Sequence, residues 1–431
     1  MASPELIDEL VANALVQPWP GLTPRGVRPP CLPGKADAVI GPRRCGKTWL
    51  VLDHAARLHQ AGLARHKLLY LNLEDERLAG LEAGELHLFI DSWYRRHPDV
   101  LGGERWLFLD EVQLVPGWER FVRRLIDERE TRIVVTGSSA RLLSTEIATS
   151  LRGRAITTEM LPFSFAEALR HRGEDIPHLW PAPTKVGATL QHALDRYLIT
   201  GGYPEVQHLS NELRARVLRD YIDVTLLRDV IERHGVSNVP ALRWMVRRLL
   251  SAPAGKFSIH RFHNDLKSAG LPVSKESLHA WLEHLEDACF MYLVPVYTQS
   301  EAVKRSNRRK AYPVDPALTP GSGDVGHRLE VVVYLELRRR GNDLAWLSNT
   351  DGTDVDFIAT AFDGTHALIQ VCATLADPQT RLRELGALAS AMSGLGLDDA
   401  TIVTLGPPET IKVREGTIHV RTASEWLLRP G

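Results

Sequence analysis

The eight residues GPRRCGKT, at positions 41–48, follow the spacing Gly-x4-Gly-Lys-[Ser/Thr] of a phosphate-binding loop. Glycines at these positions let consecutive backbone amides turn toward an anion, while the lysine reaches the β- and γ-phosphates and the hydroxyl binds Mg²⁺. A short apolar run precedes the loop and a helical pattern follows it, which is the context that the motif requires. The predicted residues for binding ATP are Gly41, Pro42, Arg43, Arg44, Cys45, Gly46, Lys47 and Thr48, with Thr48 also a magnesium ligand.

Two acidic residues end a second apolar run, RWLFLDE at 105–111. Ligands bind at the carboxyl ends of the strands in open α/β sheets, so these acids are expected beside the phosphate-binding loop. We expect Asp110 to support Mg²⁺ and Glu111 to orient and deprotonate the attacking water. An acidic turn with no such role is the alternative, and the loop upstream argues against it.

Hydroxyl and guanidinium groups follow the next apolar run. Its end, VVTGSS at 134–139, offers Ser138 or Thr136 to hydrogen-bond the γ-phosphate or the attacking water, although turn chemistry explains them equally well. Farther along, LRGR carries Arg152 and Arg154, which are candidates to stabilise transition-state charge in a neighbouring subunit. Their alternative is a pair of surface arginines.

The elements that position these residues alternate along the chain. Between about 36 and 161, short apolar runs are separated by amphipathic helical patterns, which predicts a parallel sheet covered on both faces. Helical patterns dominate the middle of the chain, and alternation resumes near its end. The predicted division is an N-terminal helix and Pro-rich segment (1–34), a phosphate-loop core (35–162), a helical region (163–235), a helix-turn-helix region (236–300) and a second α/β domain (301–431).

The composition is that of an ordinary globular protein with several domains. Of 431 residues, 44% are hydrophobic and 24% charged, which excludes a disordered or fibrous chain. The formal net charge is −1, so binding to nucleic acid or to a membrane would need local basic patches. The four cysteines are too far apart to indicate zinc or a disulfide framework. Without a signal peptide pattern or a membrane-spanning apolar run, we expect a soluble cytoplasmic protein.

Taken in order, the motifs resemble those of prokaryotic AAA+ superfamily ATPases with a C-terminal domain of the DUF4143 type. The motifs are GPRRCGKT, LFLDEVQ, VVTGSSARLLSTE, LRGR, LPFSFAEAL, GGYPE, LEDACFMYLVPVY, KAYPVDPAL and DVDFIAT. The resemblance covers about 35–390 and implies an α/β architecture: a P-loop AAA+ core with a parallel sheet, a helical lid, a winged-helix module and a C-terminal restriction-endonuclease-like domain. It also implies ATP hydrolysis, and it places Arg152 or Arg154 where AAA+ proteins carry an arginine finger. The active form would then be a homo-oligomer such as a hexameric ring.

The same resemblance implies a degenerate nuclease site in residues 301–431. Phosphodiester-cleaving domains of that fold use an acid on the first helix, an aspartate on a strand and an acid-x-Lys on the next strand to bind a divalent metal and activate water. The matching residues are Glu330, Asp356 beside Asp354, and Gln370 followed two residues later by Cys372. Because a cysteine cannot replace the lysine and Gln370 offers a metal only a neutral oxygen, we expect a docking domain without nuclease activity. An ATP-regulated nuclease is the less favoured alternative.

Basic residues gather in the connector between the helix-turn-helix region and the last domain. They are candidates for neutralising DNA phosphates: Lys304, Arg305, Arg308, Arg309 and Lys310, with Arg338–Arg340 as a second basic run. The candidate recognition helix, 274–287, has one lysine against four acids and is a poor groove reader. We expect ATP hydrolysis coupled to non-sequence-specific binding or remodelling of DNA, with branched or Holliday-junction DNA as a candidate substrate. The alternative is an ATP-dependent switch or scaffold that acts through protein partners.

Overall fold

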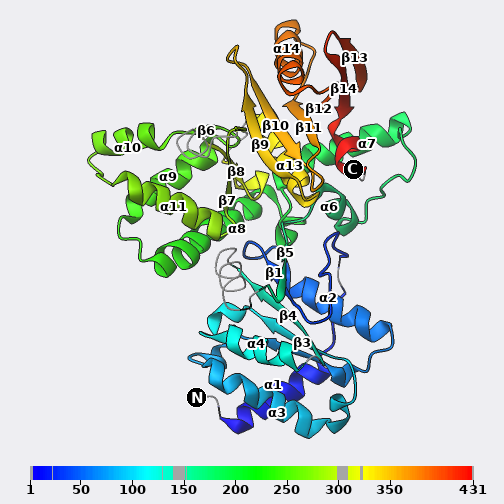
Figure 1. The fold of residues 1–431 in the computed structure, drawn as a ribbon, viewed down its shortest axis with the longest axis vertical. Helices are drawn as coiled ribbons and strands as arrows, with labels where there is room; N and C mark the ends of the chain where they lie inside the picture. Colours follow the sequence, from blue (N-terminus) through cyan, green and yellow to red (C-terminus); the bar gives the residue numbers. More distant parts are fainter. Residues whose placement is uncertain are drawn as a thin grey trace. The chain divides into compact units, whose positions relative to one another are not determined.

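Figure 1 shows the fold of the chain in a computed structural model. The structure describes residues 3–21, 23–128, 130–138, 151, 153–298, 309–320 and 324–429. The chain divides into two compact units, Met1–Met160 with Asp287–Cys289 and Leu161–Glu286 with Phe290–Gly431. Among the described residues, no helix is both long enough and apolar enough to cross a membrane.

The first unit is built on a parallel sheet whose strands lie in the order β2-β3-β4-β1-β5. Strands β1 and β3 are buried along their whole length, which explains why their sequences are nearly continuous apolar runs. The structure thus confirms the predicted parallel α/β core. The five strands are β1 (Ala36–Ile40), β2 (Leu68–Asn72), β3 (Arg105–Asp110), β4 (Thr131–Gly137) and β5 (Ala155–Glu159).

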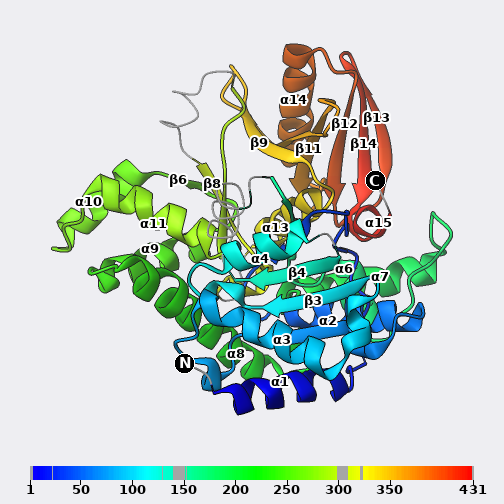
Figure 2. The same cartoon turned by 60° about the horizontal axis from the view of Figure 1, so that its bottom comes forward.

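Helices cover both faces of this sheet, as the apolar runs require. Alternate strand residues face opposite sides, so Ala38 packs with the cluster of α1, α3 and α4, whereas Val39 packs with α2. Helices α1 and α3 lie alongside each other in Figure 2. The helices are α1 (Pro4–Val16), α2 (Lys47–Gln60), α3 (Leu86–Arg96) and α4 (Trp118–Asp127).

The second unit begins with helices and continues into a small antiparallel sheet of order β6-β8-β7. The helices that begin it are α6 (Phe165–His171), α7 (Thr184–Thr200) and α8 (Asn211–Val224), the last followed by a π-helical segment at Thr225–Glu232. The elements of the small sheet region are α9 (Val239–Ser251), β6 (Lys256–Phe257), α10 (Ile259–Ser268), α11 (Lys275–Asp287), β7 (Met291–Val294) and β8 (Arg309–Pro313). In chain order, this region has one helix, a strand, two helices and two strands.

The predicted domain boundary between residues 300 and 301 is wrong. Strand β8 lies beyond it, yet Tyr312 of β8 pairs with Tyr292 of β7, and β8 also pairs with β6. The polar and basic sequence before β8 has the composition of a linker, and composition alone does not reveal which backbone groups pair. Strand β8 therefore belongs to the three-stranded sheet.

The last part of the second unit is a mixed sheet of order β13-β14-β12-β11-β10-β9. Strands β11, β12 and β14 run parallel, while β9, β10 and β13 pair antiparallel with their neighbours. Helix α14 packs through Leu388 and Met392 on one apolar cluster of the sheet, and Tyr334 of α13 lies against Phe357 of β10. The elements are α13 (Val325–Arg339), β9 (Asp343–Ser348), β10 (Asp354–Thr360), β11 (His366–Cys372), α14 (Pro378–Leu395), β12 (Asp399–Thr404), β13 (Glu409–Val413), β14 (Gly416–Thr422) and α15 (Ala423–Leu428).

A buried contact joins two of the sequence motifs inside the second unit. The backbone amide of Gly202, in GGYPE, donates to Oδ2 of Asp315 at 2.6 Å, although the two residues are 113 positions apart. Oδ1 of Asp315 accepts from the amide of Ala317 at 2.8 Å. A Cβ atom on Gly202 would lie 2.2 Å from the carbonyl oxygen of Phe163. The two motifs are therefore joined by a buried hydrogen bond at Gly202, where a larger residue would collide with the backbone.

We predict that Gly202→Ala lowers the free energy of unfolding by more than about 2 kcal/mol, because a rigid backbone atom blocks the added methyl group. Urea unfolding of the full chain measures this loss. Gly187→Ala is the matched control, since Gly187 lies within α7 and nothing that the structure describes stands within 4 Å of its Cβ position. Alanine is the better helix former by about 1 kcal/mol, so the control should be neutral or stabilising. Equal losses in both variants would contradict the prediction.

Candidate phosphate-binding site

The loop from Gly41 to Gly46 has the backbone that an anion site needs. Gly41 and Gly46 have φ angles of 156° and 101°, and a Cβ atom on Gly41 would lie 2.1 Å from the carbonyl oxygen of Met160. Helix α2 starts directly after Gly46, and within the described part of the chain no side chain caps it. The first amides of α2 therefore remain available to an anion, and the helix dipole favours negative charge there.

Lys47, the first residue of α2, is buried and folds back over this loop. Its ammonium donates to the carbonyl oxygens of Gly41 and Pro42, both at 3.1 Å, and lies 3.5 Å from Oε1 of Glu111. Burial disfavours the charged ammonium, but Glu111, together with smaller contributions from other groups such as Asp110, raises the pKa of Lys47. Lys47 is thus charged, and its partners are ones that phosphate oxygens can replace.

Asp110 stands at the end of β3 and joins three hydroxyl groups. Its Oδ2 accepts from the hydroxyl of Thr48 and from that of Tyr70, both at 2.7 Å, and its Oδ1 accepts from Thr136. Burial and the Asp110 carboxylate raise the pKa of Tyr70, so the phenol stays protonated and donates. These contacts draw residues from α2, β2, β3 and β4 together. The predicted pair of Thr48 and Asp110 is in direct contact.

Glu111 follows Asp110 in a left-handed conformation, with φ of 55°, which turns its backbone off the strand. Its amide donates to the hydroxyl of Thr136 at 2.9 Å, and its Oε2 accepts from Nε2 of Gln113 at 2.5 Å. The same nitrogen of Gln113 lies 3.4 Å from Oγ of Ser138. Burial alone would raise the pKa of Glu111, but Lys47 and the Gln113 amide lower it below its ordinary value. Glu111 is therefore an ionised carboxylate beside Ser138.

Several residues of this site were not predicted. Arg25, from the Pro-rich segment, is buried and donates through Nη1 to the carbonyl oxygen of Cys45 at 3.0 Å, so it braces the loop from outside. Tyr70 and Gln113 contact the two acids directly. The tyrosine within the otherwise apolar run KLLYLN was a signal for Tyr70, whereas nothing in the sequence around Arg25 indicated its position. The side chain of Cys45, predicted as part of the loop, points at the carbonyl oxygen of Met160.

The predicted arginine-finger residues are only partly described. Arg152 lies outside the described residues. Arg154 is exposed and forms an ion pair with Asp127 at the end of α4. Of the remaining loop residues, Arg43 lies 4.0 Å from the carboxylate of Glu74.

The structure contradicts Lys310 as a DNA-binding residue. Its side chain is buried, with Nζ 2.9 Å from Oε1 of Glu330 and 2.7 Å from Oδ1 of Asp356. Neighbouring Arg309 is half-buried in β8. From the sequence, Lys310 was expected at the surface, where it could contact DNA phosphates. In the structure, Glu330 and Asp356 hold it inside the second unit. The other connector candidates, Lys304, Arg305 and Arg308, lie outside the described residues.

The second basic run is also engaged in internal contacts. Arg338 lies with its guanidinium 4.3 Å from the ring centre of Tyr292. Arg339 donates to the carbonyl oxygen of Pro162 at 2.8 Å, and Arg340 to that of Trp426 at 2.8 Å. These contacts stabilise the second unit and engage all three guanidinium groups in part, so their role as DNA contacts stays a prediction.

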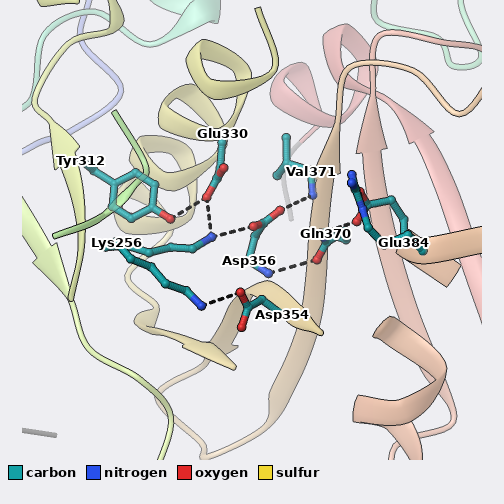
Figure 3. A network of polar contacts seen from close by, with 10 residues as sticks. Lys256, Tyr312, Glu330, Asp354, Asp356, Gln370, Val371 and Glu384 are labelled. Atoms are coloured by element: carbon teal, nitrogen blue, oxygen red, sulfur yellow. Dashed lines mark hydrogen bonds and ion pairs between the residues drawn. The ribbon is translucent and has the colours of Figure 1, made fainter. Parts of the chain in front are cut away.

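The predicted degenerate nuclease residues Glu330, Asp356 and Gln370 lie close together (Figure 3). Glu330 and Asp356 bind the same ammonium group, that of Lys310. The carbonyl oxygen of the Gln370 side chain, the neutral oxygen that this residue could offer a metal, accepts from the backbone amide of Asp356 at 3.0 Å. Asp354 pairs separately with Lys256 at 2.5 Å.

Comparisons with known proteins follow the division of the chain. Residues 34–169 match the family model described as an AAA domain, and residues 191–321 match a domain of unknown function, DUF8612. The second match is to another family than the expected DUF4143 type, and it covers the helical and three-stranded region. A solved structure of Aeropyrum pernix ORC1 in complex with DNA is similar at 15% identity and a TM-score of 0.30, over 77% of this chain and 91% of that one.

Two relatives match most of the chain. An uncharacterised protein of Haemophilus influenzae is 28% identical over 75% of this chain and 79% of its own. The uncharacterised protein MJ1544 of Methanocaldococcus jannaschii is 32% identical over 86% of this chain and 82% of its own length. The chain therefore belongs to the same family as MJ1544, and its residues 34–169 match an AAA domain.

Proposed function

We propose that the chain binds ATP with Mg²⁺ and hydrolyses it. The observation that carries this proposal is the 2.7 Å hydrogen bond from Thr48 to Asp110, formed directly beside the Lys47–Glu111 ion pair. Phosphate-loop nucleotidases use the same four groups at these positions: a hydroxyl, a lysine and two carboxylates. The match of residues 34–169 to an AAA domain supports the same assignment.

Binding would exchange internal partners for phosphate oxygens. The uncapped amides at the start of α2 face the anion, and the Lys47 ammonium would leave the carbonyl oxygens of Gly41 and Pro42 for the phosphates. The hydroxyl of Thr48 and the carboxylate of Asp110 are oxygen donors of the kind that Mg²⁺ prefers, so the residues fit the ion. The bound Mg²⁺ would neutralise phosphate charge.

Hydrolysis would use Glu111 as the base. Its lowered pKa keeps it ionised near neutral pH, so it can accept a proton from water. Gln113 fixes the carboxylate through Oε2, and Ser138 stands next to it with a hydroxyl for the water or the γ-phosphate. The ion pair with Lys47 must loosen when phosphate arrives, which would free Oε1 of Glu111 for the water.

The arginine of a second subunit would complete the site. Arg154 is exposed, and its present partner Asp127 is also exposed, so the pair is available at the surface of the first unit. A guanidinium delivered from one subunit to the phosphates of the next would make activity depend on assembly.

The target of the ATP cycle is either DNA, as predicted from the sequence, or a protein partner. Two observations favour a protein partner: Lys310 is buried, and the exposed residues of α11 include Glu276 and Glu283. Acidic residues repel phosphate, so this helix is better suited to a basic protein surface. We therefore propose a nucleotide-dependent switch that acts on a protein, with remodelling of branched DNA as the alternative.

The nucleotide site is tested with two variants that fail at different steps. Lys47→Ala should weaken ATP affinity at least about tenfold, whereas Glu111→Gln should keep affinity and lower turnover about a hundredfold or more. Fluorescent-nucleotide titration and phosphate release measure the two quantities. Lys35→Ala and Glu128→Gln, both on exposed side chains, are the matched controls and should behave as wild type. Unchanged turnover in Glu111→Gln would remove Glu111 as the base.

Mixing inactive variants tests the shared site. Arg154→Ala and Glu111→Gln should each be inactive alone but regain part of the ATPase rate when mixed, because one interface then combines Glu111 of one subunit with Arg154 of the other. A mixture of Glu111→Gln with Lys47→Ala is the control and should stay inactive, since both changes lie in the same half-site. Full activity of Arg154→Ala alone would contradict a role in trans.

The choice of target is tested by adding nucleic acid. We expect single-stranded DNA, duplex and a four-way junction to leave the wild-type ATPase rate within about twofold of the rate without DNA, because the described basic runs are engaged internally. The ATPase rate should be measured at low salt, because electrostatic contacts with DNA phosphates are least screened there. Stimulation by the junction that is absent in Lys47→Ala would establish the DNA alternative instead.

A further inference from the structure

In the second unit, one lysine ammonium lies between two acids, Glu330 and Asp356, which Figure 3 labels. Lys310 comes from β8, Glu330 from α13 and Asp356 from β10, and all three side chains are buried. The ammonium lies 2.9 Å from Oε1 of Glu330 and 2.7 Å from Oδ1 of Asp356. Although burial works against its charge, Asp356 and Glu330 raise the pKa of Lys310. The cluster therefore contains its own permanent cation.

Other groups of the protein also bind these two carboxylates. Oε1 of Glu330 also accepts from the hydroxyl of Tyr312 at 2.8 Å. Oδ2 of Asp356 accepts from the backbone amide of Val371 at 3.0 Å. Such contacts fix both carboxylates in orientations that serve the ammonium.

Gln370 and Glu384 form a second layer that is equally engaged. The Gln370 side chain accepts from the Asp356 amide through its oxygen and donates through its nitrogen to Oε2 of Glu384 at 2.6 Å. Oε1 of Glu384 accepts from Arg383 at 2.6 Å. Reversing the Gln370 amide would place two donors face to face, so its oxygen is committed to the backbone.

A divalent metal does not fit this arrangement. The restriction-endonuclease-like resemblance implies one, and a cavity of about 580 Å³ lined by Lys310, Glu330 and Asp356 gives access to the cluster. Within the described ranges, however, there is no group of three or more His, Cys, Asp or Glu side chains placed to hold a metal ion. The carboxylates that would serve as ligands already bind an ammonium, and a second cation would be repelled by it.

We propose that Lys310 is a built-in substitute for the divalent cation of a nuclease-like site, so that this domain is fixed by an internal cation and does not bind a catalytic metal. The lysine comes from the three-stranded sheet, and the acids come from the following α/β domain. With a lysine in place of the metal ion, the site no longer binds a metal and instead holds the three-stranded sheet to the α/β domain by a buried ion pair.

A neighbouring lysine makes a similar contact at the edge of the cluster. Lys256, on β6 next to β8, bonds Asp354 at 2.5 Å and lies 4.2 Å from the ring centre of Trp346 on β9. Both lysines therefore join the small sheet to the strands of the C-terminal domain. Lys256 is about one-third exposed, which makes it a matched control for the buried Lys310.

The acid–base behaviour of Glu330 predicts how the stability of a variant without Lys310 depends on pH. Burial and Asp356 raise the pKa of Glu330 to about 7, and Lys310 acts against this rise. Without Lys310, the folded state would bind a proton at Glu330 more tightly than the unfolded state does. Stability would then be retained at low pH and lost as the pH rises through the folded-state pKa.

The first test compares lysine variants in the full chain by calorimetry. Lys310→Met should lower the melting temperature of the second unit by about 5 °C or more, with a larger loss at about pH 8 than at about pH 6, whereas Lys256→Met should lower it by less than about 2 °C. Lys310→Met combined with Glu330→Gln should be more stable than Lys310→Met alone, because one unpaired charge is gone. If Lys310→Met is as stable as wild type, or no more affected than Lys256→Met, Lys310 is not the fixed cation.

The second test asks whether the unaltered cluster takes a metal. Mn²⁺ is titrated without nucleotide into the Asp110→Asn protein, so that the proposed magnesium site of the first unit does not contribute, and binding is followed by paramagnetic resonance. We expect no binding that depends on Asp356. Mn²⁺ binding that Asp356→Asn abolishes would overturn the proposal, and this result does not depend on whether Lys310→Met folds.

Discussion

The hydrogen bond between Thr48 and Asp110 depends on the strand order of the first unit more than on any local preference. Because β4 separates β1 from β3, the loop after β1 and the acids after β3 reach the same end of the sheet without being adjacent. Thr136 lies on the intervening strand β4. Its hydroxyl donates to Asp110 and accepts from the backbone amide of Glu111, and so links β4 to both acids. A change in strand order would separate the lysine, the hydroxyl and both acids at once.

Two lysines of this chain illustrate opposite uses of a buried charge. Lys47 is held by carbonyl oxygens and by one carboxylate at 3.5 Å, so an incoming anion can replace its partners. Lys310 is held by two carboxylates at 2.9 and 2.7 Å. Because breaking a buried pair leaves an uncompensated charge, the second arrangement favours permanence. The first is suited to binding a ligand and the second to fixing the fold.

Much of the first unit was predictable from the sequence, and less of the second. The phosphate loop and the acids after β3 follow from spacing and burial, since a continuous apolar run that ends in Asp110 is typical of a buried parallel strand with a polar tip. Lys310 was misassigned because sequence spacing carries no information about a partner on a distant helix such as Glu330. Arg25 and Gln113 were missed for the same reason, since each acts through contacts that only the folded chain creates.

The most direct measurement is calorimetric titration of the purified chain with ATP, with and without Mg²⁺, compared with Thr48→Val. The account predicts tight binding that Mg²⁺ strengthens in the wild type, and loss of the Mg²⁺ effect in Thr48→Val with folding unchanged. Absence of ATP binding by the folded wild-type chain in the presence of Mg²⁺ would contradict it.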